Sequence, residues 1–387
     1  MKINKNNNLP LSGVNVLDLT NVLSGPYATL ILADLGANVI KVEKPGGDDS
    51  RKYGPFIGNK SGYFLSLNRG KKSIVIDLKE SSDRVIFNKL LSKVDVLVDN
   101  FKPGTLEKFG LSWSKISKKH PKLIHAKISG FGEDGPYKNY PAYDIIVQAM
   151  GGIMSLTGSK KNDFVRVGTS IGDIVAGLFC VIGILSQLLK RKETNIGSKL
   201  DLSMLDCQVA ILENAITRFS IEKKIPFPLG TDHPSISPFG EFKTLNGSIV
   251  IAAGNNKIFN KLCNVINDLE MISNKMFRSN EYRNNNLNEL RKRIESKLKK
   301  FTTKYWLKKL NQNNIPCSPI NNIKDLLKNP QIKKRNMILD YNDQGIGNFK
   351  VSGNPIKFNF VKSNKKTKRA PDLNQDREEI LKLFDIF

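Results

Sequence analysis

Few of the residues that carry disulfide or metal chemistry are present in this sequence. Its 387 residues include four cysteines and three histidines. Because no two cysteines lie close together, neither a CxxC motif nor a zinc-finger spacing can be formed. Scattered thiols are typical of a reducing cytoplasm, which is the location we predict. The histidines are equally dispersed, so the sequence favours no metal site and no Ser/His/Asp triad.

The sequence also lacks a hydrophobic run long enough for a membrane span. Its N-terminal stretch, MKINKNNNLPLSG, has no apolar core of the kind found in signal peptides. The most apolar segment, Ile174 to Leu189, is shorter than the ~20 residues that a bilayer requires, and Ser186 and Gln187 interrupt it. We therefore expect a fully buried helix and no membrane partner.

Acidic residues are scarce relative to basic ones. Asp and Glu number 36 against 61 Lys and Arg, which gives a net charge of +25. Such a balance occurs in proteins that bind nucleic acid, anionic membranes or anionic small molecules. Here the lysines are spread along the chain, and Lys, Asn and Ile are all abundant, as an AT-rich genome produces. We predict no nucleic-acid partner and keep a basic nucleic-acid-binding protein as a distant alternative.

What the sequence does contain is an alternation of strands and helices. The first 45 residues predict a βαβ unit, with strands at Val14 to Leu19 and Asn38 to Glu43. The alternation continues with a strand at Ser73 to Leu78, a helix at Ser82 to Lys93, strands at Asp95 to Asn100 and Lys122 to Ser129, and helical stretches at Asp144 to Lys192, broken near residues 158–168, and at Ser203 to Lys223. This pattern predicts a Rossmann-like, doubly wound α/β sheet.

The composition changes near residue 225. Residues 226–240 are rich in Pro, Gly and Ser, as in a linker, and a strand at Ser248 to Gly254 precedes a basic helical region at 256–313. The tail contains GNFKVSGNPIKFNF, which predicts short strands, and a closing helix, REEILKLF. We predict a large domain at 1–225, a smaller α+β domain at 226–330, and a return to the large domain at 331–387.

The first βαβ unit lacks the glycine pattern of a dinucleotide site. That site requires G-x-G-x-x-G, whereas the turn here reads Leu23-Ser24-Gly25-Pro26. NAD binding is therefore not expected, although this fold class still binds ligands at the carboxyl ends of its strands. Lysines recur at or after those ends, at Lys44, Lys79, Lys102 and Lys108. They are either solvated surface residues or charges that hold a phosphorylated ligand.

Asp173 lies at the start of a long apolar helix. Ser170 precedes it by three residues, which resembles a capping box, so a helix-capping carboxylate is the simplest interpretation. A functional interpretation is also sound, because backbone N–H groups and the positive helix end would keep the carboxylate ionised. Gly172 beside it would leave room for a substrate. The local sequence leaves both interpretations open.

Several stretches resemble the family III CoA transferases, the family of formyl-CoA transferase and of the carnitine and bile-acid CoA transferases. They are LSGVNVLDLTNVLSGPYATLILADLGANVIKVEKPGGDDSR, NRGKKSIVIDLK, DVLVDNFKPGTLEKFGL, HAKISGFGEDGPYKNYPAYDIIVQAMGG, the Asp173 segment, HPSISPFGEFKTLNG, IPCSPINNI and GNPIKF. They follow one another over nearly the whole chain. The glycine-run loop of formyl-CoA transferase has no counterpart, because that region reads His233-Pro234-Ser235. The resemblance therefore implies the reaction class but not formyl-CoA or oxalate as substrates.

The resemblance implies an interlocked homodimer in which each chain has a Rossmann-like large domain and a smaller domain. It assigns the catalytic nucleophile to Asp173, in the Gly172-Asp173 pair that opens a helix. It implies a coenzyme A thioester as substrate, with no permanently bound cofactor. The CoA-contacting positions that it implies are Leu23, Ser24, Lys44, Ile76, Asp77, Leu78, Lys79, Asn100, Phe101, Lys102, Lys108, Tyr143 and Asp144.

The same family contains α-methylacyl-CoA racemases, which pair the helix-opening aspartate with a histidine in a Gly-His-Asp motif. That motif reads Ala142-Tyr143-Asp144 here, so Tyr143 holds the histidine position. Tyrosine, with a pKa of about 10, is a poor general base at neutral pH. The substitution favours a transferase, with a racemase or isomerase of the same fold as the alternative.

We therefore predict an enzyme that moves CoA from an acyl-CoA donor to a carboxylic acid acceptor. The predicted intermediates are aspartyl anhydrides and an aspartyl-CoA thioester, because covalent catalysis divides the exchange into easier steps. Backbone N–H groups near Gly151-Gly152 or around His233 are candidate oxyanion donors. The sequence names neither the donor nor the acceptor.

Overall fold

The computed structural model describes residues 9–343, 345–361 and 367–386. The chain divides into two compact units. The first unit comprises residues 1–153, 166–220 and 330–387, and the second comprises residues 154–165 and 221–329. The chain therefore leaves the first unit and returns to it, because the tail packs with the N-terminal part.

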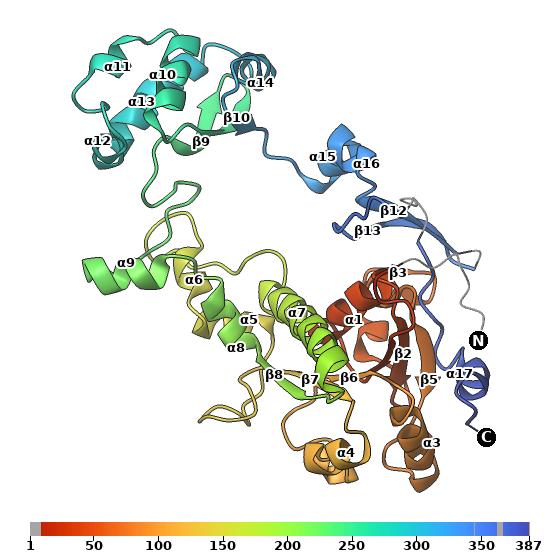
Figure 1. Ribbon diagram of the computed structural model, residues 1–387. Helices are drawn as coiled ribbons and strands as arrows, with labels where there is room; N and C mark the ends of the chain where they lie inside the picture. The colour runs from red at the N-terminus through yellow and green to blue at the C-terminus, as the bar shows by residue number, and fades with distance from the viewer. Residues whose placement is uncertain (1–8, 344, 362–366, 387) are drawn as a thin grey trace. The chain divides into compact units, whose positions relative to one another are not determined.

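A six-stranded sheet forms the centre of the first unit, and all of its neighbouring strands are parallel (Figure 1). The strand order is β5-β2-β1-β6-β7-β8. Counted along the chain, this is the order of the doubly wound dinucleotide-binding folds. The Rossmann-like prediction is therefore confirmed. The strands are β1 (Asn15–Asp18), β2 (Asn38–Glu43), β5 (Lys72–Val75), β6 (Val96–Asp99), β7 (Ile124–Ser129) and β8 (Lys199–Ser203).

Helices cover both faces of this sheet. Successive residues of a strand point to opposite faces, so their side chains pack in two separate hydrophobic cores. Val16 and Val98 belong to the core that includes α1 and α7, whereas Leu17 and Leu97 belong to the core under α3, α4 and α17. The helices of this unit are α1 (Ser24–Asp34), α2 (Gly62–Asn68), α3 (Ser81–Leu91), α4 (Trp113–Lys119), α5 (Asp144–Met150), α7 (Ile171–Thr194), α8 (Met204–Ala210), α16 (Pro330–Lys334) and α17 (Arg377–Leu383), with 3-10 turns η1 (Asp49–Lys52) and η2 (Glu107–Phe109).

Small antiparallel pairs complete the first unit. β3 (Phe56–Ile57) pairs with β4 (Lys60–Ser61), and β12 (Ile338–Asp343) pairs with β13 (Gly347–Ser352). The tail is bound to the edge of the large sheet, since Ser73 donates its backbone N–H to the Asp376 carboxylate at 2.8 Å. Of the short strands expected in GNFKVSGNPIKFNF, only β13 forms, and residues 354–360 contain no strand.

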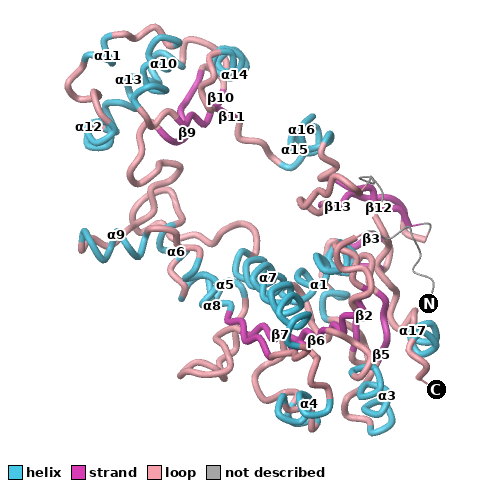
Figure 2. Tube along the Cα trace, viewed as in Figure 1, coloured by secondary structure: helices cyan, strands magenta, loops and turns pink. Residues whose placement is uncertain are grey.

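The second unit has its own sheet and core (Figure 2). Its three-stranded antiparallel sheet has the order β11-β10-β9. Its elements are β9 (Phe239–Thr244), β10 (Gly247–Ala252), β11 (Cys317–Ser318), α10 (Asn256–Val265), α11 (Glu270–Ser273), α12 (Asn280–Asn285), α13 (Leu287–Leu298), α14 (Thr303–Gln312) and α15 (Ile323–Lys328). Two further helices, α6 (Ile153–Leu156) and α9 (Ala215–Glu222), lie where the chain passes between the units.

Two details of the predicted elements are wrong for local reasons. The helical stretch expected over Ser203 to Lys223 is two helices, α8 and α9, separated by residues 211–214. The sixth strand, β8, was not predicted, because its sequence KLDLS alternates polar and apolar residues at the edge of the sheet.

The helix α7 is long and apolar enough to cross a membrane by length and composition alone. It is not the fully buried helix that the sequence predicted, because only 39% of its most apolar window is buried. One face packs against α1, β7 and β8. The other exposes Leu178, Ile182, Leu185 and Leu189, which recur at helical spacing. Since the packed face belongs to the core, the helix cannot leave the domain without dismantling it.

Candidate active site

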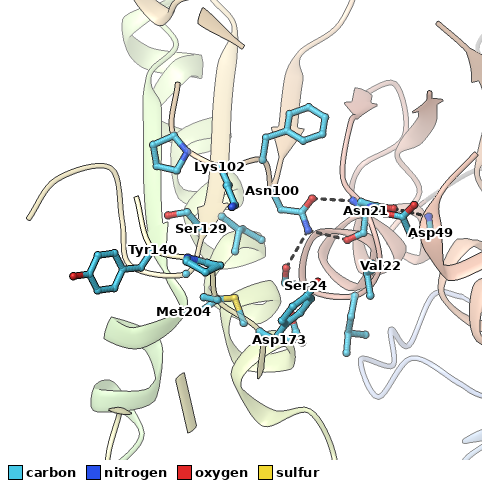
Figure 3. A pocket seen from close by; sticks show the side chains of 18 of the residues that line it. Asn21, Val22, Ser24, Asp49, Asn100, Lys102, Ser129, Tyr140, Asp173 and Met204 are labelled. Atoms are coloured by element: carbon cyan, nitrogen blue, oxygen red, sulfur yellow. Dashed lines mark hydrogen bonds between the residues drawn. The ribbon is translucent and has the colours of Figure 1, made fainter. Parts of the chain in front are cut away.

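A cavity of about 410 Å³ opens at the carboxyl ends of β1, β6 and β7. β1 and β6 are the adjacent strands at which the strand order reverses, and doubly wound sheets bind ligands at this point. The cavity lining comes from the turns after these strands, from residues 138–143 and from the first turn of α7 (Figure 3). The fold thus places a pocket where the sequence predicted ligand binding.

Seven of the predicted site residues line this cavity together. They are Leu23, Ser24, Asn100, Phe101, Lys102, Tyr143 and Asp173. Lys44 and Phe101 also line a smaller neighbouring cavity of about 90 Å³. The structure therefore brings the predicted nucleophile and the strand-end residues to one place.

Other predicted contacts lie outside this cavity. Ile76 is buried in the core beneath α3, and Asp77, Leu78, Lys79 and Lys108 are not among the lining residues. Asp144 does not line the cavity either, but it lies directly behind Asp173, because its Oδ1 accepts a hydrogen bond from the Gly172 backbone N–H at 2.8 Å. Only part of the predicted CoA-contacting set thus surrounds the nucleophile.

Asn21 also lines the cavity, and it lies just after β1, at one of the strand ends where the sequence predicted ligand binding. Sequence reasoning missed other lining residues, among them Asp49, Tyr53, Lys138 and Tyr140. These four lie in loops and turns whose sequences give no sign of where they pack.

Asn100 joins the turns after β1 and β6. Its Oδ1 accepts from the Asn21 backbone N–H at 2.8 Å, and its Nδ2 donates to the Asn21 carbonyl at 2.8 Å and to Ser24 Oγ at 3.3 Å (Figure 3). The amide side chain thereby fixes two strand ends that share no regular hydrogen bonds at this level. It also orients the Ser24 hydroxyl toward the pocket.

The side chain and the backbone N–H of Ser24 lie close enough to the Asp173 carboxylate to favour its ionised form. Burial and, to a lesser degree, the negative charge of Asp144 raise the pKa of Asp173 to about 7. The raised pKa runs opposite to the expectation that backbone N–H groups and the positive helix end keep this carboxylate ionised. The capping-box interpretation is wrong, because the Ser170 side chain makes no capping hydrogen bond.

Glycines allow α7 and the turn after β1 to pack closely against the start of α1. A Cβ atom on Gly177 would lie 2.7 Å from the Ser24 carbonyl oxygen, and one on Gly25 would lie 2.2 Å from Thr20 Cγ2. Only residues without a side chain fit at these two positions. The N-terminal turn of α1, with its unpaired N–H groups, is thereby directed at Asp173.

A buried ionic network supports the first turn of α1 from below. Lys71 donates to Asp18 Oδ2 at 3.0 Å, to the Pro26 carbonyl at 3.1 Å, to Thr29 Oγ1 at 2.8 Å and to Asn68 Oδ1 at 2.8 Å. Burial lowers the pKa of Lys71 to about 8, and Asp18 opposes that shift. Burial opposes the charge of Asp18 too, but its lysine neighbours hold its pKa below the ordinary value.

Two lysines provide positive charge near the cavity. Lys102 lines it directly, and Lys44 donates to Asp49 Oδ1 at 2.7 Å at its rim. Both lysine side chains come from the ends of parallel strands, as predicted. A cavity with a buried carboxylate, oriented N–H donors and peripheral lysines suits an anionic substrate with an electrophilic carbonyl.

Comparison with known protein families gives a match over residues 11–377 to the model of CoA-transferase family III. The chain belongs to CoA-transferase family III. It is 40% identical over 377 residues to acetyl-CoA:oxalate CoA-transferase of Acetobacter aceti, covering 97% of this chain and 96% of that protein. It is 39% identical over 375 residues to succinyl-CoA:glutarate CoA-transferase of Mus musculus, covering 96% and 86%.

A solved structure described as a CAIB/BAIF family protein from Brucella suis is similar to this CoA transferase. The two share 34% identity and a TM-score of 0.86, covering 98% of this chain and 100% of the other. The predicted family and enzyme class are confirmed. The enzyme transfers CoA between an acyl-CoA and a carboxylic acid.

Proposed function

We propose that this CoA transferase works through Asp173 as a covalent nucleophile. The observation that carries the proposal is the position of the Asp173 carboxylate in the cavity, beside the hydroxyl and the backbone N–H of Ser24. A pKa of about 7 leaves a substantial ionised fraction at neutral pH. Such a group is a competent nucleophile and also a good leaving group in the return step.

The exchange proceeds in four balanced steps. A carboxylate oxygen of Asp173 attacks the thioester carbonyl of the donor, the C–S bond breaks, and CoA leaves as its thiolate with a mixed anhydride remaining. The thiolate attacks the aspartyl carbonyl and releases the donor carboxylate, which leaves an aspartyl-CoA thioester. The acceptor carboxylate displaces the thiolate to form a second anhydride, and the thiolate then attacks the acceptor carbonyl and frees Asp173. No net proton is consumed.

Ser24 supplies the oxyanion donors in this proposal. Its hydroxyl and its backbone N–H lie beside the Asp173 carboxylate, and negative charge develops on this group whenever the aspartyl carbonyl is attacked. Preorganised donors at a helix N-terminus stabilise such charge without reorganising. Ser24 therefore replaces Gly151-Gly152 and the His233 region as the proposed donor.

The remaining predicted contacts are proposed to bind CoA itself. Lys102 and Lys44 are suited to phosphate groups, and Asp77, Leu78, Lys79 and Lys108 would contact parts of the ligand that extend beyond the cavity, whereas Ile76 is buried in the core. CoA is a substrate in this proposal, and no permanently bound cofactor takes part. For the acceptor we propose a dicarboxylic acid, because the two relatives described above are named for oxalate and glutarate.

Hydroxylamine trapping tests the covalent intermediate directly. The enzyme is incubated with an acyl-CoA and hydroxylamine, digested, and examined by mass spectrometry. We expect a hydroxamate on the peptide that contains Asp173, because hydroxylamine attacks the aspartyl anhydride or thioester. A reaction that turns over with no modification of this peptide, or with equal modification in Asp173→Ala, would contradict the proposal.

A racemase of the same fold is the second candidate, and one observation disfavours it. A racemase needs a second acid/base group opposite Asp173, and the residue at the matching position, Tyr143, is 74% exposed. An exposed phenol is not held in the geometry that proton transfer at the α-carbon requires. Deuterium exchange at the α-carbon of an acyl-CoA in the absence of an acceptor would favour the racemase instead.

We also propose that two copies form the interlocked homodimer that the resemblance implies, with the exposed α7 stripe in the interface. This stripe consists of Leu178, Ile182, Leu185 and Leu189. Contiguous exposed apolar side chains on a helix are typical of protein–protein interfaces. A cytoplasmic location stays a prediction.

Charge placed on the α7 stripe should weaken the dimer. We expect the wild type to remain dimeric on dilution, because interlocked chains cannot separate without unfolding. Ile182→Glu should lower the yield of dimer strongly when the protein is refolded from urea, because interlocked chains must associate while they fold. Val85→Glu, at a similarly exposed apolar residue on α3, is the control and should leave the dimer intact. Light scattering after size exclusion measures both, and a monomeric wild type or an unchanged Ile182→Glu dimer would overturn this assignment.

A further inference from the structure

A buried amide on α5, outside the cavity, is bonded directly to one end of the segment that leads into the nucleophile and, through Asp144, to the other end. Gln148 is fully buried. Its Nε2 donates to Asp144 Oδ2 at 2.7 Å, and its Oε1 accepts from the backbone N–H of Val167 at 2.9 Å. The other oxygen of Asp144 accepts from the backbone N–H of Gly172 at 2.8 Å. Two α5 side chains thus bind the first and last residues of segment 167–172.

This clamp holds the residue next to the nucleophile at a fixed distance from α5. A Cβ atom on Gly172 would lie 2.7 Å from Val147 Cγ2 and 3.0 Å from Asp144 Oδ1, so α5 and the start of α7 touch through the glycine. Asp173 follows immediately. A shift of segment 167–172 would therefore move the Asp173 carboxylate relative to Ser24.

The clamp also fixes a charge beside the nucleophile. The Asp144 carboxylate is bonded on one oxygen to Gln148 and on the other to Gly172, and Arg166 lies 3.6 Å from Oδ2 on the solvent side. Asp173 itself and Tyr63, whose pKa is raised to about 12 by burial and by the negative charge of Asp173, are the other titratable groups in this electrostatic neighbourhood. An amide satisfies Asp144 without adding a second negative charge.

We propose that Gln148 is a positioning residue for the CoA-transfer reaction, which acts through Asp144 and segment 167–172 on the orientation and charge environment of Asp173. The inference rests on the proposed role of Asp173 as nucleophile. Gln148 touches neither the cavity nor any reacting atom, so its effect is on kcat rather than on the binding of CoA.

The first test replaces Gln148 with methionine, which is similar in length but lacks both hydrogen-bonding groups. We expect kcat to fall by roughly 10- to 100-fold, the scale of a misplaced reacting group. KM for the acyl-CoA should change by less than about threefold, because the strand-end residues of the cavity are untouched. An unchanged kcat, or a loss confined to KM, would overturn the proposal.

The second test uses Gln148→Glu, whose shape keeps the acceptor for Val167. The introduced carboxyl group can donate to Asp144 only while the two carboxyl groups share a proton, and close carboxylates hold such a proton to raised pH. We expect activity close to the wild type near about pH 6 and a new decline above about pH 8, when the shared proton is lost. The wild type should show no such decline.

A purely structural role for Gln148 would lower the amount of folded enzyme without changing the shape of the pH profile. If Gln148→Glu has the wild-type profile, the proposal is therefore wrong, even where the methionine variant fails to fold. Hydroxylamine trapping in the wild type separates this outcome from a failure of the proposed function. If Asp173 is trapped but the Gln148 variants behave like the wild type, only the inference about Gln148 is wrong.

Discussion

Replacing Asp173 with asparagine is expected to lower kcat/KM for CoA transfer by a factor on the order of 10⁴ or more, as the loss of a covalent nucleophile does. The amide cannot form the anhydride. In the wild type only the ionised carboxylate attacks, and its pKa is raised to about 7. The kcat/KM of the wild type should therefore rise with pH through about 7 and level off above it. Initial rates across the pH range measure both effects.

The same substitution should stabilise the fold. The pKa of Asp173 is higher in the folded protein than in the unfolded chain. The free energy of unfolding therefore falls as the pH rises from about 4 to about 7. Asp173→Asn removes this loss, and we expect a gain of roughly 2–4 kcal/mol in unfolding free energy near pH 8 and little gain near pH 4. Asp206→Asn, at an exposed residue of α8, is the control. Activity close to the wild type in Asp173→Asn or Asp173→Ala would disprove the nucleophile.

Replacing Lys71 with methionine is expected to destabilise the first unit by about 3–5 kcal/mol, because it leaves Asp18 charged and buried with one ionic partner removed. Asp18 and Lys71 both have fully buried side chains, and their atoms lie 3.0 Å apart. The loss of the bond to the Pro26 carbonyl also frees the first turn of α1. We expect kcat to fall in the same variant, since that turn carries the Ser24 donors.

The chain offers a matched control and a local probe for this prediction. Lys72 is the next residue, and its ion pair with Glu379 is solvent-exposed, so Lys72→Met should cost less than about 1 kcal/mol. The two tryptophans lie in different units, Trp113 on α4 and Trp306 on α14. In a Trp306→Phe background, tryptophan fluorescence during urea unfolding reports the first unit alone. Equal midpoints for the Lys71 and Lys72 variants would contradict the ionic network.

The six-stranded sheet was predictable because parallel strands that are buried on both faces have mostly apolar sequences. Asn38 to Glu43 was predicted with the bounds that β2 has. The edge strand β8 is buried less completely and escaped detection. The burial of Lys41 and Lys71 could not be predicted from the sequence, because lysines are rarely buried. Their burial depends on Asp48 and Asp18, which come from other elements of the fold.

The candidate site was predictable only where a family pattern or a strand end marked it. Asp173 was found through the resemblance, whereas its true partner, Ser24, is supplied by a helix far away in the sequence. Local sequence pointed to Ser170 instead, since a capping box is a local pattern. Nothing in the sequence marked Gln148 as a site residue, because its role depends on the segment that packs against it in the fold.

The return of the tail to β5 has a consequence for synthesis of the protein. Ser73 and Asp376 are hydrogen-bonded to each other but separated by 303 positions in the chain. At ribosomal speeds of roughly 5–20 residues per second, the edge of the large sheet waits about 15–60 s for the segment that covers it. During that time β5 presents unpaired backbone groups to other nascent chains. Asn374, Asp376 and Arg377 therefore close this edge, and a chain that ended before Asn374 would leave exposed an edge made early in translation.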